Sequence, residues 1–117
     1  MKKLIIAVTI LFLIIVLSFV TEAQTRPKIT FIELGSVSCI PCKKMQPVMK
    51  NIEKKFGEQI KVVFYDVMKQ KEKIDEYKMK LMPTQVFLDE NGKEIYRHEG
   101  FYPEKDIEKF LRSKGLK

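Results

Sequence analysis

Both cysteines of this 117-residue chain fall in one stretch, SVSCIPCKKMQP, at residues 36–47. Cys39 and Cys42 lie where a predicted strand (29–35) gives way to a helix whose first turn contains Pro41, a residue favoured at helix starts. Their spacing brings the two side chains to one edge of that turn, close enough for a disulfide. Four interpretations fit such a pair: a redox-active dithiol, half of a metal site, an inert disulfide, or coincidence.

Chemistry separates these interpretations. Structural zinc takes four ligands, and the chain adds only one distant histidine, His98, which we expect to lie solvated on a strand. An inert disulfide would close a very small loop and remove little entropy from the unfolded chain. A helix start, in contrast, favours a thiolate at Cys39, while Cys42, one turn in, should be more buried. We therefore expect Cys39 to attack a disulfide and Cys42 to resolve the mixed disulfide.

The N-terminus has the layout of an export signal. Met1-Lys2-Lys3 is followed by an uncharged run, LIIAVTILFLIIVLSFV, at residues 4–20. As a helix this run would reach about 26 Å, just short of a bilayer's hydrocarbon core. Residues 1–23 are therefore predicted to be either a signal peptide, with cleavage after Ala23, or a membrane anchor. Either arrangement places the rest of the chain outside the cytoplasm, on the periplasmic or cell-surface side.

The remainder is predicted to be a linker, residues 24–28, and one small domain, residues 29–117. The chain has 22 Lys and Arg against 15 Asp and Glu, but the two signs are interleaved, so the excess favours solubility. Because no basic run is interleaved with aromatic residues, we expect no nucleic-acid partner. We expect the domain to be a monomer.

The apolar pattern alternates between strand and helix periods. Strands are expected at 29–35, 60–67, 84–88 and 93–99, and helices from Pro41 to about Gly57, over 71–81, and from Pro103 to about Gly115. The second strand is apolar enough to be buried on both faces. In the second helix, Ile74, Tyr77 and Leu81 are expected to share one face.

The connections between these elements predict the topology. Two strands joined through a helix favour parallel neighbours. The DENG turn at residues 89–92 predicts an antiparallel hairpin. The order βαβαββα therefore predicts an α/β fold, with a mixed four-stranded sheet and helices on both faces, preceded by an N-terminal hydrophobic helix.

The sequence resembles the thioredoxin family over residues 29–112. CIPC, residues 39–42, resembles that family's cysteine motif, and Pro47 matches the proline that kinks its active-site helix. MPT, residues 82–84, resembles the cis-proline loop that faces the cysteines. The resemblance implies a thioredoxin-like fold and a redox-active Cys39–Cys42 disulfide, with no metal and no other cofactor. It also implies that substrate peptides contact Met82, Pro83, Thr84, Ile40 and Pro41.

Glu33 is a further candidate catalytic residue. Strand alternation sets it in line with Ile29 and Phe31. The resemblance implies a buried acid here, beneath Cys42; without a cation its pKa should rise, and it would relay a proton to or from Cys42. The alternative is a plain surface glutamate. Departures from the family include Ser38, which replaces a usual tryptophan, and Phe64, which falls where a lysine often pairs with the acid.

The residues between the cysteines bear on the direction of electron flow. Ile40 and Pro41 supply neither charge nor a hydrogen-bond donor, whereas strong oxidants of the superfamily tend to carry histidine there. We therefore expect a protein-disulfide reductase outside the cytoplasm, supplied with electrons by an integral-membrane thiol carrier. Apocytochromes c, in cytochrome c biogenesis, are candidate clients by analogy. The alternatives are a disulfide oxidase or isomerase, and a redox-inactive peptide-binding module.

Overall fold

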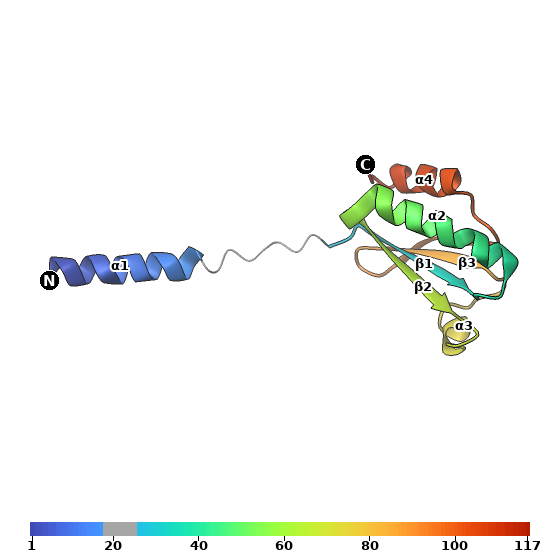
Figure 1. Cartoon of the computed structure of the whole chain (residues 1–117), viewed down its shortest axis with the longest axis horizontal. Helices are drawn as coiled ribbons and strands as arrows, with labels where there is room; N and C mark the ends of the chain where they lie inside the picture. The colour runs from blue at the N-terminus through green and yellow to red at the C-terminus, as the bar shows by residue number, and fades with distance from the viewer. Residues whose placement is uncertain (18–25) are drawn as a thin grey trace.

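The computed structural model describes residues 1–17 and 26–117. The predicted cleavage after Ala23, the end of the apolar run and the first residues of the predicted linker lie outside these ranges. Among the described residues the elements, in chain order, are α1 Lys2–Leu17, β1 Ile29–Gly35, α2 Ile40–Phe56, the short 3-10 helix η1 Gly57–Gln59, β2 Ile60–Asp66, α3 Glu72–Glu76, β3 Thr84–Asp89, β4 Glu94–Glu99 and α4 Glu104–Ser113 (Figure 1).

The four strands form one sheet in the order β2-β1-β3-β4. β1 runs parallel to β2, its partner across the α2 connection, and antiparallel to β3. β3 and β4 form the antiparallel hairpin that the turn at residues 89–92 predicts. The predicted α/β class, the order βαβαββα and the mixed sheet are thus confirmed.

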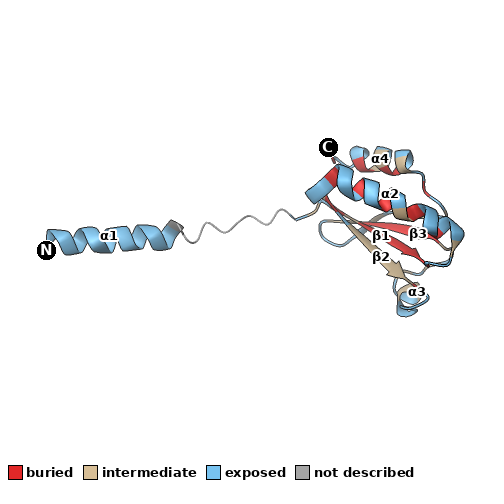
Figure 2. Ribbon diagram, viewed as in Figure 1, coloured by how far each residue is buried: buried red, intermediate tan, exposed pale blue. Residues whose placement is uncertain are grey.

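Helices cover both faces of the sheet, as predicted. α2 and α4 lie side by side on one face, where their apolar side chains meet the sheet in the larger core (Figures 1 and 2). At its centre Phe87 stacks on Phe31, with 4.8 Å between ring centroids, and meets Phe110 of α4 edge-on at 4.8 Å. The opposite face carries a smaller core, in which Ile74 of α3 and Tyr77 pack against Val86 and its neighbours.

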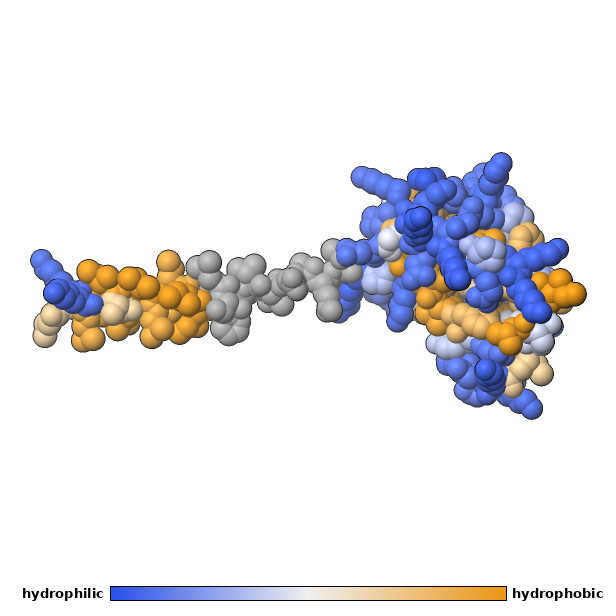
Figure 3. All heavy atoms as spheres, in the orientation of Figure 1, coloured by the Kyte–Doolittle hydropathy of each residue, from blue (hydrophilic) through white to orange (hydrophobic). Residues whose placement is uncertain are grey.

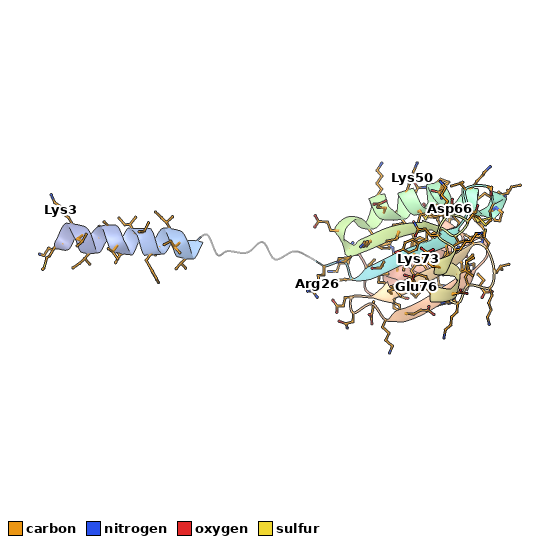
Figure 4. All side chains as sticks on the ribbon, turned by 90° about the horizontal axis from the view of Figure 1, so that it is seen from below. Lys3, Arg26, Lys50, Asp66, Lys73 and Glu76 are labelled. Carbon is orange, nitrogen blue, oxygen red and sulfur yellow. A yellow bond between two sulfur atoms is a disulfide. The ribbon has the colours of Figure 1, made fainter. Side chains whose placement is uncertain are left out.

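The predicted helix over residues 71–81 is wrong in extent, because α3 ends at Glu76. Lys78 adopts φ 51°, and the N–H groups of Met79 and Lys78 donate to the carbonyls of Ile74 and Asp75, the pattern of a Schellman stop. Leu81 consequently lies beyond the helix and is half exposed. An ion pair between Lys73 and Glu76, 2.7 Å apart, lies on the surface of α3 (Figure 4).

The expectation that the second strand is buried on both faces is also wrong. β2 is an edge strand, and after Ile60 its residues are exposed or half-buried. Its apolar residues contact the cores on both faces, but within residues 1–17 and 26–117 one of its edges has no neighbouring strand.

α1 consists mostly of exposed apolar residues. Figure 3 shows them in contrast to the face of the domain turned to the viewer, which is largely hydrophilic. Within residues 1–17 and 26–117, no helix has both the length and the hydropathy needed to cross a membrane.

Candidate active site

Cys39 is the N-cap residue of α2. Its backbone is extended, with φ −83° and ψ 127°, and its sulfur accepts a hydrogen bond from the backbone N–H of Cys42 at 3.3 Å. Pro41, in the first turn, has no N–H to satisfy. The Cys39 sulfur therefore occupies the place of a capping oxygen, at the positive end of the helix dipole.

The two cysteines form a disulfide with their Cα atoms 5.1 Å apart, and they differ in exposure. Cys39 is half-buried, whereas Cys42 has no exposed surface. The side chain of Ile40 between them is 69% exposed. An incoming sulfur atom therefore has access to Cys39 and not to Cys42, and Cys42 is the more buried of the two, as expected.

The loop before Cys39 is fixed by serine hydroxyls. Ser36 is buried, and its hydroxyl accepts from the N–H of Ser38 at 3.3 Å and contacts the Ser38 hydroxyl at 2.9 Å. The Ser36 carbonyl in turn accepts from the N–H of Cys39 at 3.3 Å. This short turn connects β1 to α2 and so holds the cysteine at the helix start.

Gly35 makes room for the buried cysteine. A Cβ atom at this position would lie 3.1 Å from the Cys42 sulfur and 3.3 Å from the Cys42 Cβ. Cys42 therefore packs directly on the backbone of β1, and any side chain at Gly35 would displace it. Gly35 shares its face of β1 with Glu33, two residues earlier, so the buried sulfur lies over the strand that carries the acid.

Glu33 is fully buried, on the same face as Ile29 and Phe31, as strand alternation predicts. Both carboxyl oxygens accept from Nε2 of Gln85, at 3.2 and 3.3 Å. Burial raises the pKa of Glu33 to about 8, against the smaller lowering effect of the Gln85 hydrogen bond. The position beside it on β2 is Phe64, so this neighbour supplies no cation.

Gln85 and His98 are residues that sequence reasoning missed as part of the site. Gln85 is fully buried, and its Oε1 lies 2.8 Å from Nδ1 of His98. The expectation of a solvated His98 is wrong: it is half-buried, and its ring stacks on Tyr102 with 4.0 Å between centroids. The available signal was the glutamine within the apolar strand TQVFL.

The Pro83 loop lies at the same end of the sheet as the cysteines. The Met82–Pro83 bond is cis, as the resemblance implies. Thr84 opens β3 directly opposite Leu34, near the end of β1 that leads to Cys39. The Pro83 carbonyl accepts from the N–H of Gly100 at 2.7 Å, and the Thr84 hydroxyl donates to the Leu81 carbonyl at 2.5 Å.

Acidic, histidine and cysteine side chains of the described residues form no group of three that could hold a metal ion. The reactive groups of the site are two sulfur atoms at the start of α2 and a buried acid on the adjoining strand β1.

This fold, with a CxxC pair at the start of its first core helix, defines the class of thioredoxin-like disulfide oxidoreductases. The model of the Thioredoxin-like domain family matches residues 19–115, and the chain belongs to that family.

Individual relatives agree with this assignment. Thioredoxin Y, chloroplastic, of rice is 29% identical over 74% of this chain, which spans about half (51%) of the rice protein. Thioredoxin of Bacillus subtilis is 25% identical over 77% of this chain and 86% of its own length. The structure of Fasciola hepatica thioredoxin superposes with a TM-score of 0.66 at 26% identity, covering 76% of this chain and 84% of that one.

Proposed function

We propose that the chain is a thiol-disulfide oxidoreductase that reduces protein disulfides. The observation that carries the proposal is the capping position of the Cys39 sulfur, 3.3 Å from the N–H of Cys42. Once the disulfide is reduced, this N–H and the helix dipole stabilise a thiolate at Cys39. A half-buried thiolate at a helix start is a nucleophile that a protein disulfide can reach.

The reaction proceeds in two exchanges. The Cys39 thiolate attacks one sulfur of the substrate disulfide, which forms a mixed disulfide and releases the other substrate sulfur as a thiolate. Cys42 then loses its proton and attacks the Cys39 sulfur, which restores the Cys39–Cys42 disulfide and releases the second substrate sulfur as a thiolate. Two electrons pass from the dithiol to the substrate, whose thiolates take up protons.

Glu33 accepts the proton that Cys42 loses. Its pKa of about 8 makes its carboxylate a stronger base than an ordinary glutamate and keeps both protonation states accessible near neutral pH. The Cys42 sulfur lies over Gly35 on the same strand face, which places donor and acceptor in one buried region. The proton of Cys42 can therefore pass to Glu33 within this buried region as the Cys42 sulfur attacks.

Substrate binds around the exposed sulfur. Ile40 and Pro41 present an apolar surface beside Cys39. The Pro83 loop forms the second wall of this site, where the backbone of the half-buried Met82 pairs with an extended substrate segment. Thr84, expected to contact substrate, is instead fully buried and supports the loop from beneath.

The reducing direction rests on Ile40 and Pro41, which supply no group that would stabilise the dithiol beyond the helix start. The basic N-terminus and the apolar α1 support a location outside the cytoplasm, through export or anchoring by residues 4–20. There the protein would receive electrons from an integral-membrane thiol carrier and pass them to client disulfides, apocytochromes c among them.

Insulin reduction with dithiothreitol tests the activity. The wild-type protein is expected to accelerate precipitation of the insulin B chain, and Cys39→Ser to give only the uncatalysed rate. Equal rates for the two proteins would contradict catalysis and favour a peptide-binding module.

Equilibration with glutathione tests the direction, because about 30 mV corresponds to a tenfold change in the equilibrium constant. A potential near that of thioredoxin, about −270 mV, is expected, and a value near about −120 mV would indicate an oxidase. Labelling of Cys39 in intact cells by a membrane-impermeant maleimide tests the location, and mixed disulfides trapped by Cys42→Ser identify the clients.

A further inference from the structure

Three polar side chains form one row across three adjacent strands. In the register of the sheet, Glu33 of β1 lies opposite Gln85 of β3, and Gln85 lies opposite His98 of β4. Hydrogen bonds join all three, at 3.2 and 3.3 Å on one side of Gln85 and 2.8 Å on the other. The row therefore connects the buried carboxyl to a half-buried ring on the edge strand.

The chemistry of the amide fixes the direction of these hydrogen bonds. Above its pKa of about 8, Glu33 is a carboxylate that only accepts, so Gln85 then turns its Nε2 toward Glu33. Its Oε1 then faces His98 and accepts, which requires the proton of the neutral imidazole to lie on Nδ1. His98 is itself held by its stack on Tyr102, whose N–H donates to the sulfur of Met45 on α2 at 3.5 Å.

We propose that Gln85 and His98 are positioning residues for the Glu33 carboxylate: His98 holds the Gln85 amide in the one orientation that presents its N–H groups to the acid. This inference rests on the proposed function, in which Glu33 accepts the proton of Cys42. The row stabilises the charged form of a buried base that has no cation beside it. Without the row, the Glu33 carboxylate would lack its hydrogen-bond donors, and the Glu33 carboxyl would keep its proton to higher pH.

The surroundings of the row leave this role to Gln85 and His98. Beside Glu33, β2 presents Phe64, and Cys42 of α2 packs over Gly35, two residues along the same strand face. The ion pairs seen in residues 1–17 and 26–117 do not involve Glu33. Around His98, Tyr102 stays uncharged because burial raises its pKa above the usual value. The charged groups on that side are Asp106 and Lys109 of α4, which line an open surface hollow together with His98.

The test is the titration of the Glu33 carboxyl carbon by NMR in the oxidised protein. His98→Leu and Gln85→Leu are each expected to raise the titration midpoint by about one pH unit, the effect of losing a hydrogen bond to a charged group. His98→Asn keeps an N–H donor near the position of Nδ1 and is expected to restore the wild-type midpoint. Arg97→Leu, next to His98 on the opposite face of β4, is the matched control and should leave it unchanged.

An unchanged midpoint in His98→Leu would overturn the proposal. A second measurement needs no variant: nitrogen NMR of the neutral His98 ring in the wild-type protein, recorded above about pH 8 where Glu33 is ionised, should find the proton on Nδ1. A proton on Nε2 alone would contradict the row. Neither readout depends on turnover. A wild-type protein inactive on insulin would therefore remove the proposed function while these titrations still decide the positioning role. In an active protein, His98→Leu should also shift the pH profile of mixed-disulfide resolution to higher pH.

Discussion

The backbone N–H of Cys42 donates a hydrogen bond to the sulfur of Cys39 across 3.3 Å. Cys39 therefore caps the helix whose first turn contains Cys42. The relationship makes the two sulfurs chemically different although they lie a single turn apart. Cys39 has the helix dipole and access to solvent, while Cys42 is enclosed by the core and lies over Gly35.

This difference predicts the order of alkylation in the reduced protein. Cys42→Ser leaves the Cys39 thiol and Cys39→Ser leaves the Cys42 thiol, so iodoacetamide rates can be measured separately by mass spectrometry. At neutral pH we expect Cys39 to react at least about tenfold faster, because its thiolate is stabilised and exposed. Faster reaction at Cys42 would contradict the assignment of roles.

Glu33 predicts a pH dependence of stability. Its pKa is about 8 in the folded protein, against 4.5 for an unperturbed glutamate, so folding takes up a proton between these values. Proton uptake by Glu33 contributes its full stabilisation of the folded state below about pH 4.5. As pH rises toward 8, the free energy of unfolding falls by about 1.4 kcal/mol per unit, and the loss ends above the folded pKa. Urea denaturation should show this slope in wild type relative to Glu33→Gln; parallel curves would contradict it.

Phe64→Lys should narrow the pH range of that slope, so that the loss of stability ends about 1–3 pH units lower than in the wild type. Phe64 lies beside Glu33 in the parallel register, and a lysine there would place a cation near the carboxylate. An opposite charge within ~4–6 Å lowers a carboxyl pKa by about 1–3 units. NMR titration of Glu33 measures the change. Val62→Lys, one row away on the same face of β2, is the control and should have the smaller effect; equal shifts would argue against pairing.

Gly35→Ala should disturb Cys42. The added methyl group would lie 3.1 Å from the Cys42 sulfur, closer than ordinary contact. Overpacking of this kind costs about 1–3 kcal/mol, and displacement of the sulfur should slow resolution so that mixed disulfides accumulate. Denaturation and gel analysis of trapped complexes provide the measurements. Thr30→Ala, on the opposite face of β1, should leave resolution at the wild-type rate, and the same rate in Gly35→Ala would refute the crowding argument.

Phe87→Ala tests the main core. The ring is fully buried between Phe31 and Phe110, and its removal should lower the free energy of unfolding by about 3–5 kcal/mol. Phe101 is 42% exposed, and Phe101→Ala should cost less than about 0.5 kcal/mol. Comparable losses in the two variants would show that the stacked aromatic cluster is not the centre of the core.

Elements with local signals were predictable. Pro41 and Gly57 mark the two ends of α2, and the turn at residues 89–92, with Gly92 at φ 81°, defines the hairpin. The predicted extent of α3 is wrong because the helix stop uses Lys78 in a left-handed conformation, where glycine is the usual signal. The edge position of β2 was hidden for another reason: an apolar strand looks the same in sequence whether one or both of its edges are paired.

The site was predictable only in part. The positions of Cys39 and Cys42 follow from a short local pattern, and the burial of Glu33 from strand alternation together with family resemblance. The row through Gln85 to His98 depends on the registers of β1 with β3 and of β3 with β4. Those registers are set by packing between distant segments, and a sequence read strand by strand does not contain them.

The strand order has a consequence for how partners are met. β1 and β3, from which the cysteine turn and the Pro83 loop depart, are the inner strands, hydrogen-bonded along both sides. The backbone beneath the reacting sulfur is thus the last part of the domain to open in local fluctuations. Binding at this backbone requires little ordering of this chain, so most of the conformational entropy lost on binding comes from the bound polypeptide. For the proposed reductase activity, we therefore expect loosely folded substrate proteins, which have the most freedom to lose, to bind briefly and to depart once their sulfurs are released.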